Sequence, residues 1–244
     1  MQPQPLTIEY RFRLQDNSEE LFTILLDPQT LEALTDPAAP LPHWTTLSFA
    51  QCASCPLNEA ASPHCPAAAN LAPIIQRVEK LVSIDQVDLQ VTTAERITLQ
   101  KTTAQRALSS LMGLVIATSG CPHTAFLKPM ARFHLPLASE EETMFRATAT
   151  YMLAQYFVKN EGGQADFNLE KLTNLYRTMQ EVNLAMAKRV RSASKTDSSV
   201  NAIVLLDMYA KALPYVIKQS LDELRYLFEP FLKTVGTPEK SSSA

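Results

Sequence analysis

The chain has 244 residues and a formal net charge of −3, from 22 basic and 25 acidic side chains, and apolar residues make up 46% of it. This composition is that of a compact globular protein and excludes an intrinsically disordered one. The slight acidity gives no attraction to a phosphate backbone, so we expect no nucleic-acid partner. Neither an export signal nor a long apolar run is found, so we expect a cytoplasmic protein without a membrane span.

The N-terminal part has the two-residue periodicity of β-strands. Residues 8–14 alternate apolar and polar side chains, and residues 21–26 are the expected hairpin partner across a turn at 16–18. A third strand is expected over Trp44–Phe49, after a loop over residues 27–42 that contains four prolines. The chain is thus expected to begin with antiparallel strands.

The middle of the chain predicts one helix and a second pair of strands. Pro73 near a first turn, followed by Ile74, Val78 and Leu81, indicates a helix to about residue 81. Alternating residues at 87–91 and at 97–99, with a turn between them, predict two more antiparallel strands.

From Thr102 onward the apolar residues recur with helical periodicity. A helix over 104–118 should end at Ser119 and Gly120, and Ser139 with Glu142 forms a capping-box pattern for a helix to about 159. Further helices are predicted over 169–193 and 198–228, the last with a kink at Pro214.

These elements predict an α+β fold, in which a small antiparallel sheet in the N-terminal part packs on a C-terminal helical bundle. We expect a β-rich part over 1–101 that carries three of the four cysteines, and a helical part over 102–232 that carries the fourth. Residues 233–244 are expected to form a disordered tail, since they are rich in serine and charge.

The cysteines are the main indication of function. Cys52 and Cys55 form a C-x-x-C pair, Cys65 follows after a short loop, and Cys121 comes directly after the expected end of a helix. Thiols in a reducing compartment are more often metal ligands or reactive groups than disulfides. The spacing predicts one tetrahedral site with these four cysteines as ligands, and zinc is the first expected metal.

Two alternatives stay open at the cysteines. Proline follows three of them, at positions 56, 66 and 122, and this pattern also occurs where four thiolates hold an iron–sulfur cluster. The thiols could equally be metal-free, either buried or redox-active. His64 and His123 lie next to cysteines in the sequence and are candidates to replace one or to support the site.

A second candidate site lies in the segment from Lys128 to His134. Arg132 and His134 are candidates to bind an anionic cofactor or substrate there, although a solvated loop explains the same charges. The basic residues Lys188, Arg189, Arg191 and Lys195 are interpreted as cations that stabilise the end of a helix. Glycine-rich phosphate-binding signatures and the G-x-S-x-G pattern are missing from the sequence.

The segments IEYRFRL, CASCPL, HCPAAANL, LMGLVIATSGCP, LKPMARFHLPLASEEETMFRATATYMLAQYF and VNAIVLL, which span nearly the whole chain, resemble those of an uncharacterised bacterial domain-of-unknown-function family. The resemblance implies that the cysteines and the PMARFHLP segment belong to a shared architecture. It implies no activity.

Three functional hypotheses follow. The first is a binding or scaffold protein, with an unidentified protein partner, whose sheet is clamped to its helices by a structural metal; a closed four-thiolate shell leaves no position for a substrate. The second is an iron–sulfur or thiol-based redox sensor that uses the same four cysteines. The third is an enzyme with a pocket near Cys121 that is bordered by His123, Arg132 and His134. The sequence favours a protein that is not an enzyme and leaves the oligomeric state open.

Overall fold

The computed structural model describes residues 4–35, 40–219 and 222–235 of the chain. Four strands, β1 (Leu6–Arg13), β2 (Glu19–Leu26), β3 (Gln86–Thr92) and β4 (Ile97–Thr103), form one sheet in the order β2-β1-β3-β4. All three neighbouring pairs are antiparallel. Both predicted hairpins are therefore confirmed, and Asn17 supplies the positive φ of 64° in the turn of the first.

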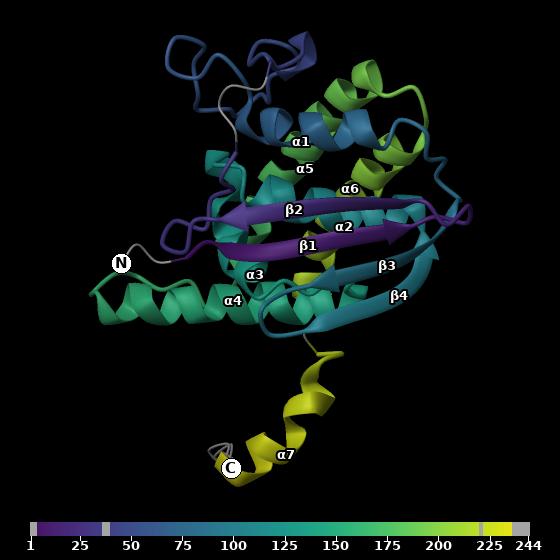
Figure 1. Cartoon of the computed structure of the whole chain (residues 1–244). Coiled ribbons are helices and arrows are strands. Elements are labelled where there is room, and N and C mark those ends of the chain that lie inside the picture. The colour runs from purple at the N-terminus through teal and green to yellow at the C-terminus, as the bar shows by residue number, and fades with distance from the viewer. Residues whose placement is uncertain (1–3, 36–39, 220–221, 236–244) are drawn as a thin grey trace, which may run out of the picture.

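One face of the sheet is apolar and covered by helices. Tyr10 lies opposite Phe22 on β2 and Val91 on β3, and these three side chains are buried. The other face is polar, and there Arg11 and Arg13 both pair with Glu19. Figure 1 shows the helices behind the sheet, which is the expected way to bury the apolar face.

Seven α-helices and two short 3-10 helices make up the rest of the described chain. They are η1 (His43–Thr45), α1 (Pro66–Arg77), α2 (Ala104–Ala117), η2 (Pro122–Leu127), α3 (Lys128–Arg132), α4 (Glu140–Asn160), α5 (Glu170–Ala193), α6 (Ser198–Gln219) and α7 (Arg225–Val235). With the N-terminal antiparallel sheet, they confirm the α+β fold class.

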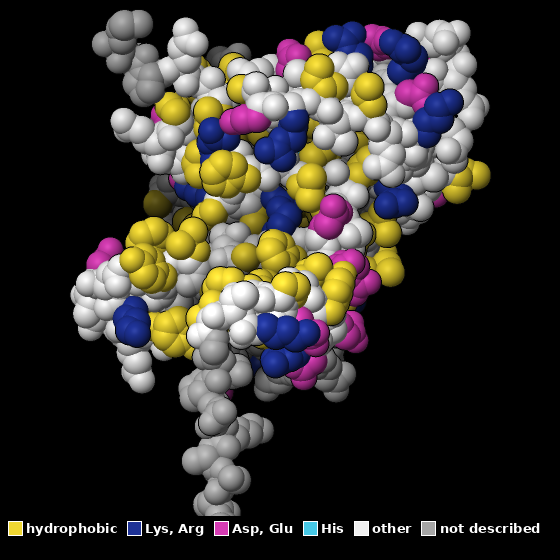
Figure 2. All heavy atoms as spheres, turned by 90° about the horizontal axis from the view of Figure 1, so that it is seen from below, with side chains coloured by type: hydrophobic (Ala, Val, Ile, Leu, Met, Phe, Trp, Pro, Cys, Tyr) yellow, Lys and Arg dark blue, Asp and Glu magenta, His cyan; other side chains and the backbone are white. Residues whose placement is uncertain are grey.

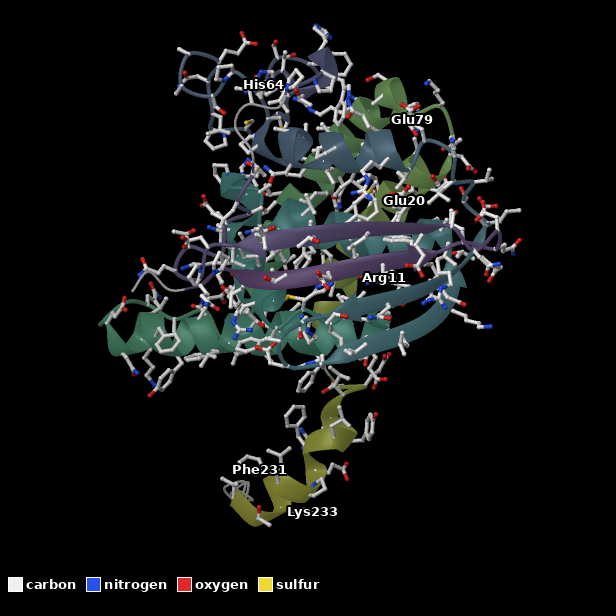
Figure 3. The ribbon with its side chains drawn as sticks, viewed as in Figure 1. Arg11, Glu20, His64, Glu79, Phe231 and Lys233 are labelled. Carbon is white, nitrogen blue, oxygen red and sulfur yellow. The ribbon has the colours of Figure 1, made fainter. Side chains whose placement is uncertain are left out.

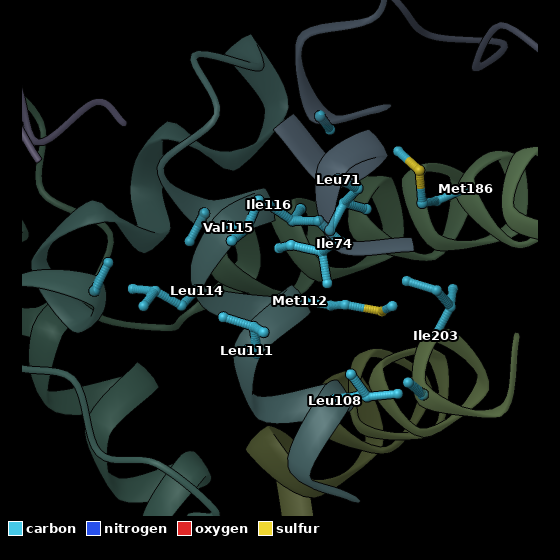
Figure 4. Packing of buried hydrophobic residues seen from close by; sticks show 14 of the residues in the cluster. Leu71, Ile74, Leu108, Leu111, Met112, Leu114, Val115, Ile116, Met186 and Ile203 are labelled. Carbon is cyan, nitrogen blue, oxygen red and sulfur yellow. The ribbon is translucent and has the colours of Figure 1, made fainter. Parts of the chain in front are cut away.

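Helix α2 lies at the centre of the core. Figure 4 shows its apolar side chains between those of α1, α5 and α6, with Met112 near Ile203. Helices α2 and α6 approach closely at Gly113, where an added Cβ would lie 3.2 Å from Leu206 Cδ2. A larger side chain at position 113 would therefore force Leu206 to move.

Three predicted helices are confirmed together with their end signals. Helix α2 ends near the expected cap, and Gly120 has a φ of 79°. Helix α4 begins with the predicted capping box, in which Ser139 Oγ accepts from the Glu142 backbone N–H and Glu142 accepts from the Ser139 backbone N–H. Helix α5 covers the predicted range almost fully.

The predicted strand over Trp44–Phe49 is wrong. The segment begins with η1, and its only ladder contact among the described residues is a single bridge between Thr46 and His64. Its backbone carbonyls at positions 44, 46 and 47 accept hydrogen bonds from the Arg189 side chain instead. A distant side chain thus replaces the neighbouring strand that the alternation suggested.

The bounds of two predicted helices are also wrong. Helix α1 begins at Pro66, directly after Cys65, and Pro73 lies inside it rather than at its first turn. The helix predicted over 198–228 is two helices, α6 and α7. Residues 233–235, predicted to be disordered, belong to α7, and residues 236–244 of the predicted tail lie outside the described residues.

Helix α7 projects from the body of the protein (Figure 1) and buries none of its residues. Figure 2 shows hydrophobic side chains gathered on the face from which it projects. Its Tyr226 hydroxyl donates to Glu141, and Phe228 stacks on Phe145 of α4. Within the described ranges no single helix is long and apolar enough to span a membrane, although α2 and segment 122–132 pass that test as a bent pair.

Candidate functional site

The loop before α1 folds back on itself and carries three of the four cysteines. The Cys55 backbone N–H donates to the Cys52 carbonyl at 3.1 Å, which closes the C-x-x-C segment into a turn. The Cys65 backbone N–H donates to the Thr45 carbonyl at 2.8 Å. Figure 3 shows the neighbouring His64 in this loop, above α1. The loop thus holds Cys65 at the entrance to a helix.

Cys65 and Cys121 occupy equivalent positions in two different helices. Each is the residue before a helical segment whose first residue is proline, at Pro66 of α1 and Pro122 of η2. Their φ and ψ angles are nearly the same, −67° and 119° for Cys65 and −65° and 125° for Cys121. Each of the two cysteines therefore lies at the start of a helical segment, where backbone N–H groups have no partner within the helix.

The four thiols are close enough to act on one another electrostatically. Burial raises the pKa of Cys52 to about 11, with further contributions from Cys65, Cys121 and Cys55, whereas Arg189 acts to lower it. Burial also raises the pKa of Cys121, and the nearby backbone N–H groups of His123 and Thr124 act in the opposite direction. Without a metal ion beside them, Cys52 and Cys121 therefore keep their protons at neutral pH.

Hydrogen bonds connect the C-x-x-C turn to the helical part beside Cys121. Ser54 Oγ donates to Glu181 Oε2 on α5 at 2.5 Å, and the Ser54 carbonyl accepts from His123 Nε2 at 2.9 Å. His123 is thus held by the loop. His64 Nδ1 must donate to Thr45 Oγ1, because that hydroxyl gives its proton to the Pro42 carbonyl.

Arg189 is the strongest anchor of this region. Its side chain is 1% exposed, and its guanidinium donates to the carbonyls of Trp44 and Thr46 at 2.7 Å and of Leu47 at 2.9 Å. Cys65, Cys52 and Cys55 are near enough to raise its pKa, although burial lowers it overall. The prediction that Arg189 stabilises the C-terminal end of its own helix is therefore wrong.

No three or more His, Cys, Asp or Glu side chains of the described residues are grouped so that they could hold a metal ion as they stand. The four cysteines are neighbours, but their side chains do not converge on a common centre. A metal at these thiols therefore stays a prediction.

The structure separates Arg132 from His134. Arg132 points to the sheet and pairs with Glu95 at 3.0 Å. His134 lines a cavity under α2, where its Nε2 is hydrogen-bonded to the buried Tyr10 hydroxyl, which is also 2.8 Å from Ser110 Oγ. Neither Arg132 nor His123 lines that cavity, so the geometry gives no support to a shared catalytic pocket.

The surroundings of His134 lead to a pH prediction. Burial, with a smaller contribution from the Arg146 charge, lowers the pKa of His134 to about 3. The unfolded histidine has a pKa of roughly 6.5, so below that pH the unfolded chain takes up a proton that the folded chain does not. Folding stability should therefore fall by up to about 1.4 kcal/mol for each pH unit below roughly 6.5, until about pH 3.

Urea unfolding of the wild type and of His134→Gln at several pH values measures how the free energy of unfolding of each protein depends on pH. Other groups titrate in both proteins, so the quantity of interest is the difference between the two. Between pH 6.5 and 5 the wild type should lose about 2 kcal/mol more than the variant. Parallel pH curves would contradict the assignment of a neutral His134 in the folded chain.

The model of one family matches residues 8–229, and its description is "Domain of unknown function (DUF6901)". No curated protein and no solved structure matches the chain.

Proposed function

The chain belongs to this family of a domain of unknown function, and we propose that it is a cytoplasmic four-cysteine metal-binding protein with a binding or scaffold role. Cys52, Cys55, Cys65 and Cys121 would hold one metal ion, with zinc as the first candidate. The observation that carries the proposal is that thiols from three separate segments act on one another, because Cys65, Cys121 and Cys55 each help to raise the pKa of Cys52.

The chemistry of the donor set fits such an ion. Four thiolates suit zinc and iron–sulfur clusters, and oxygen-seeking cations such as magnesium and calcium do not bind them well. For the sulfurs to converge on one ion, the cysteine side chains would have to rotate about χ1 between staggered positions. A four-thiolate zinc site has a net negative charge, which the two helix N-termini and Arg189 would help to stabilise.

The position of the thiols suits a structural role. The metal would join the loop before α1 to the start of η2, and through Ser54 and Glu181 this loop also contacts α5. With all four ligands supplied by the protein, no position is left for a substrate. The metal would therefore fix the loop that forms this end of the molecule, and the fixed loop surface would be what a partner contacts.

An iron–sulfur cluster is the second candidate for the same ligands. The proline after Cys55, Cys65 and Cys121 motivates it, because iron–sulfur loops share this feature. Such a cluster would give a redox sensor rather than a structural staple. Zinc is colourless and clusters absorb visible light, so the spectrum of protein purified without oxygen distinguishes the two.

A chelator should destabilise the purified protein. If the metal contributes roughly 4 kcal/mol to folding, a small part of the free energy seen in zinc-finger peptides, the Tm should fall by about 10 °C. Thermal unfolding, followed by circular dichroism with and without a strong zinc chelator, measures the shift in Tm. Added zinc should reverse that shift. An unchanged Tm after complete treatment would refute the structural metal.

A further inference from the structure

A second, separate site is the cavity of about 210 Å³ that His134 lines. Five parts of the chain surround it: α2, the segment from Leu127 to Ala138, the start of α4, and the facing sides of α5 and α6. None of the four cysteines borders it. Most of its wall is apolar, formed by side chains such as Leu114, Met130 and Leu213.

Asn183 of α5 gives the first sign that this cavity takes a ligand. The residue is 2% exposed and lines the cavity. Its Oδ1 accepts no hydrogen bond from any described residue. A buried amide oxygen without a donor costs roughly 1–3 kcal/mol, so such groups are usually paired in the functional state. Because Oδ1 is itself buried, the Asn183 amide must turn about χ2 to accept a hydrogen bond from a donor inside the cavity.

Arg146 of α4 gives the second sign. Its Nη2 donates to the carbonyls of Met130 at 2.8 Å and Phe133 at 2.9 Å, which fixes the guanidinium at the cavity wall. It forms no ion pair with a carboxylate of the described residues, and desolvation lowers its pKa. Arginine nonetheless keeps its charge in proteins. A fixed cation with unused N–H groups thus lines the cavity, and the Glu142 carboxylate is near enough to raise its pKa without forming an ion pair with it.

The side chains that line the cavity carry a net positive charge. Arg106, an exposed residue of α2, also borders the cavity. Aspartate and glutamate are absent from the lining that the structure describes. His134 is neutral near pH 7, and the buried hydroxyl of Tyr176 adds a further polar group. An anion with an apolar body matches these walls.

We propose that this cavity binds a small organic acid with an apolar body, such as an aromatic 2-hydroxy acid. The carboxylate pairs with Arg146, and the hydroxyl donates to Asn183 Oδ1. The volume of about 210 Å³ exceeds the roughly 150 Å³ of an apolar cavity that holds benzene, so a six-carbon ring with a short acid chain fits. The assignment does not depend on a metal at the cysteines.

The test uses the full chain with three probes: mandelate, phenylacetate and phenylacetamide. Calorimetric titration should show that phenylacetate binds at least about tenfold more tightly than its uncharged amide, because only the acid pairs with Arg146. Mandelate should bind more tightly still, by about tenfold, through its hydroxyl. Equal affinities of acid and amide, or no binding of any probe up to about 10 mM, would overturn the proposal.

Three variants assign the contacts. Arg146→Met should weaken phenylacetate by at least about tenfold, whereas Arg177→Met, which removes an exposed arginine of α5, should leave its affinity within about twofold. Asn183→Leu should abolish the preference for mandelate over phenylacetate and raise the Tm of the free protein, since it removes an unpaired buried oxygen. The assigned contacts would be refuted if Arg146→Met bound phenylacetate as tightly as the wild type does. They would also be refuted if Asn183→Leu still preferred mandelate over phenylacetate.

Discussion

Replacing Arg189 with methionine is expected to lower the free energy of unfolding by about 3–5 kcal/mol. The guanidinium donates to three backbone carbonyls of a single segment, and none of the four strands that the structure describes pairs with that segment. Methionine has a similar length but no donor, so three carbonyls would lose their partners in a largely buried place. Few surface substitutions reach that size.

The single tryptophan reports this change directly. Trp44 is 9% exposed, and its carbonyl is one of the three acceptors. Urea unfolding followed by tryptophan fluorescence should show a lower midpoint in Arg189→Met. Arg191→Met, which removes an exposed arginine of the same helix, should change stability by less than about 0.5 kcal/mol. Equal effects of the two substitutions would show that Arg189 does not anchor the loop.

Substituting the four cysteines should reveal whether they act as a unit. If one metal holds them all, each single change to serine removes the same ion, so the four variants should lose similar stability, roughly 4 kcal/mol. The double variant Cys52→Ser with Cys121→Ser should lose little more than either single one. Strong non-additivity of this kind is typical of residues that share one interaction.

Without a metal, the same four changes should behave differently. Cys121 is buried, whereas Cys52, Cys55 and Cys65 are partly exposed. Serine at position 121 would then cost more than serine at position 55, and the double change would cost the sum of the single ones. Thermal unfolding of the six proteins, including the wild type, therefore separates the two accounts.

The parts of the fold that local pattern controls could be predicted from the sequence. The hairpin of β1 and β2 follows from strict alternation, and the start of α4 follows from Ser139 and Glu142, whose capping contacts span three residues. The segment at Trp44 failed because its partner is Arg189, 145 positions away. Such long-range contacts leave no periodic trace in the sequence.

The candidate sites, too, could be predicted from the sequence only in part. The cysteine spacing pointed to four thiols, of which Cys65, Cys121 and Cys55 act electrostatically on Cys52 in the fold, and their sharing of one metal stays a prediction. In the segment before α4 the sequence pointed to Arg132, but the arginines that line the cavity are Arg106 of α2 and Arg146 of α4. The sequence does not show that the Arg132 side chain pairs with Glu95 whereas that of Arg146 lines the cavity. Asn183 carried no signal at all in the sequence, since an unpaired amide is visible only in three dimensions.

The central claim is that the four cysteines hold one metal, and metal content measured by native mass spectrometry of protein purified without oxygen tests it most directly. We predict one zinc ion per wild-type chain and none in Cys65→Ser or in Cys121→Ser, whose cysteines precede two different helical segments. A mass increase that matches iron and sulfide would mean that the four cysteines share one site but hold an iron–sulfur cluster instead of zinc. Wild-type protein that binds no metal after reconstitution, or variants that keep it, would contradict the claim.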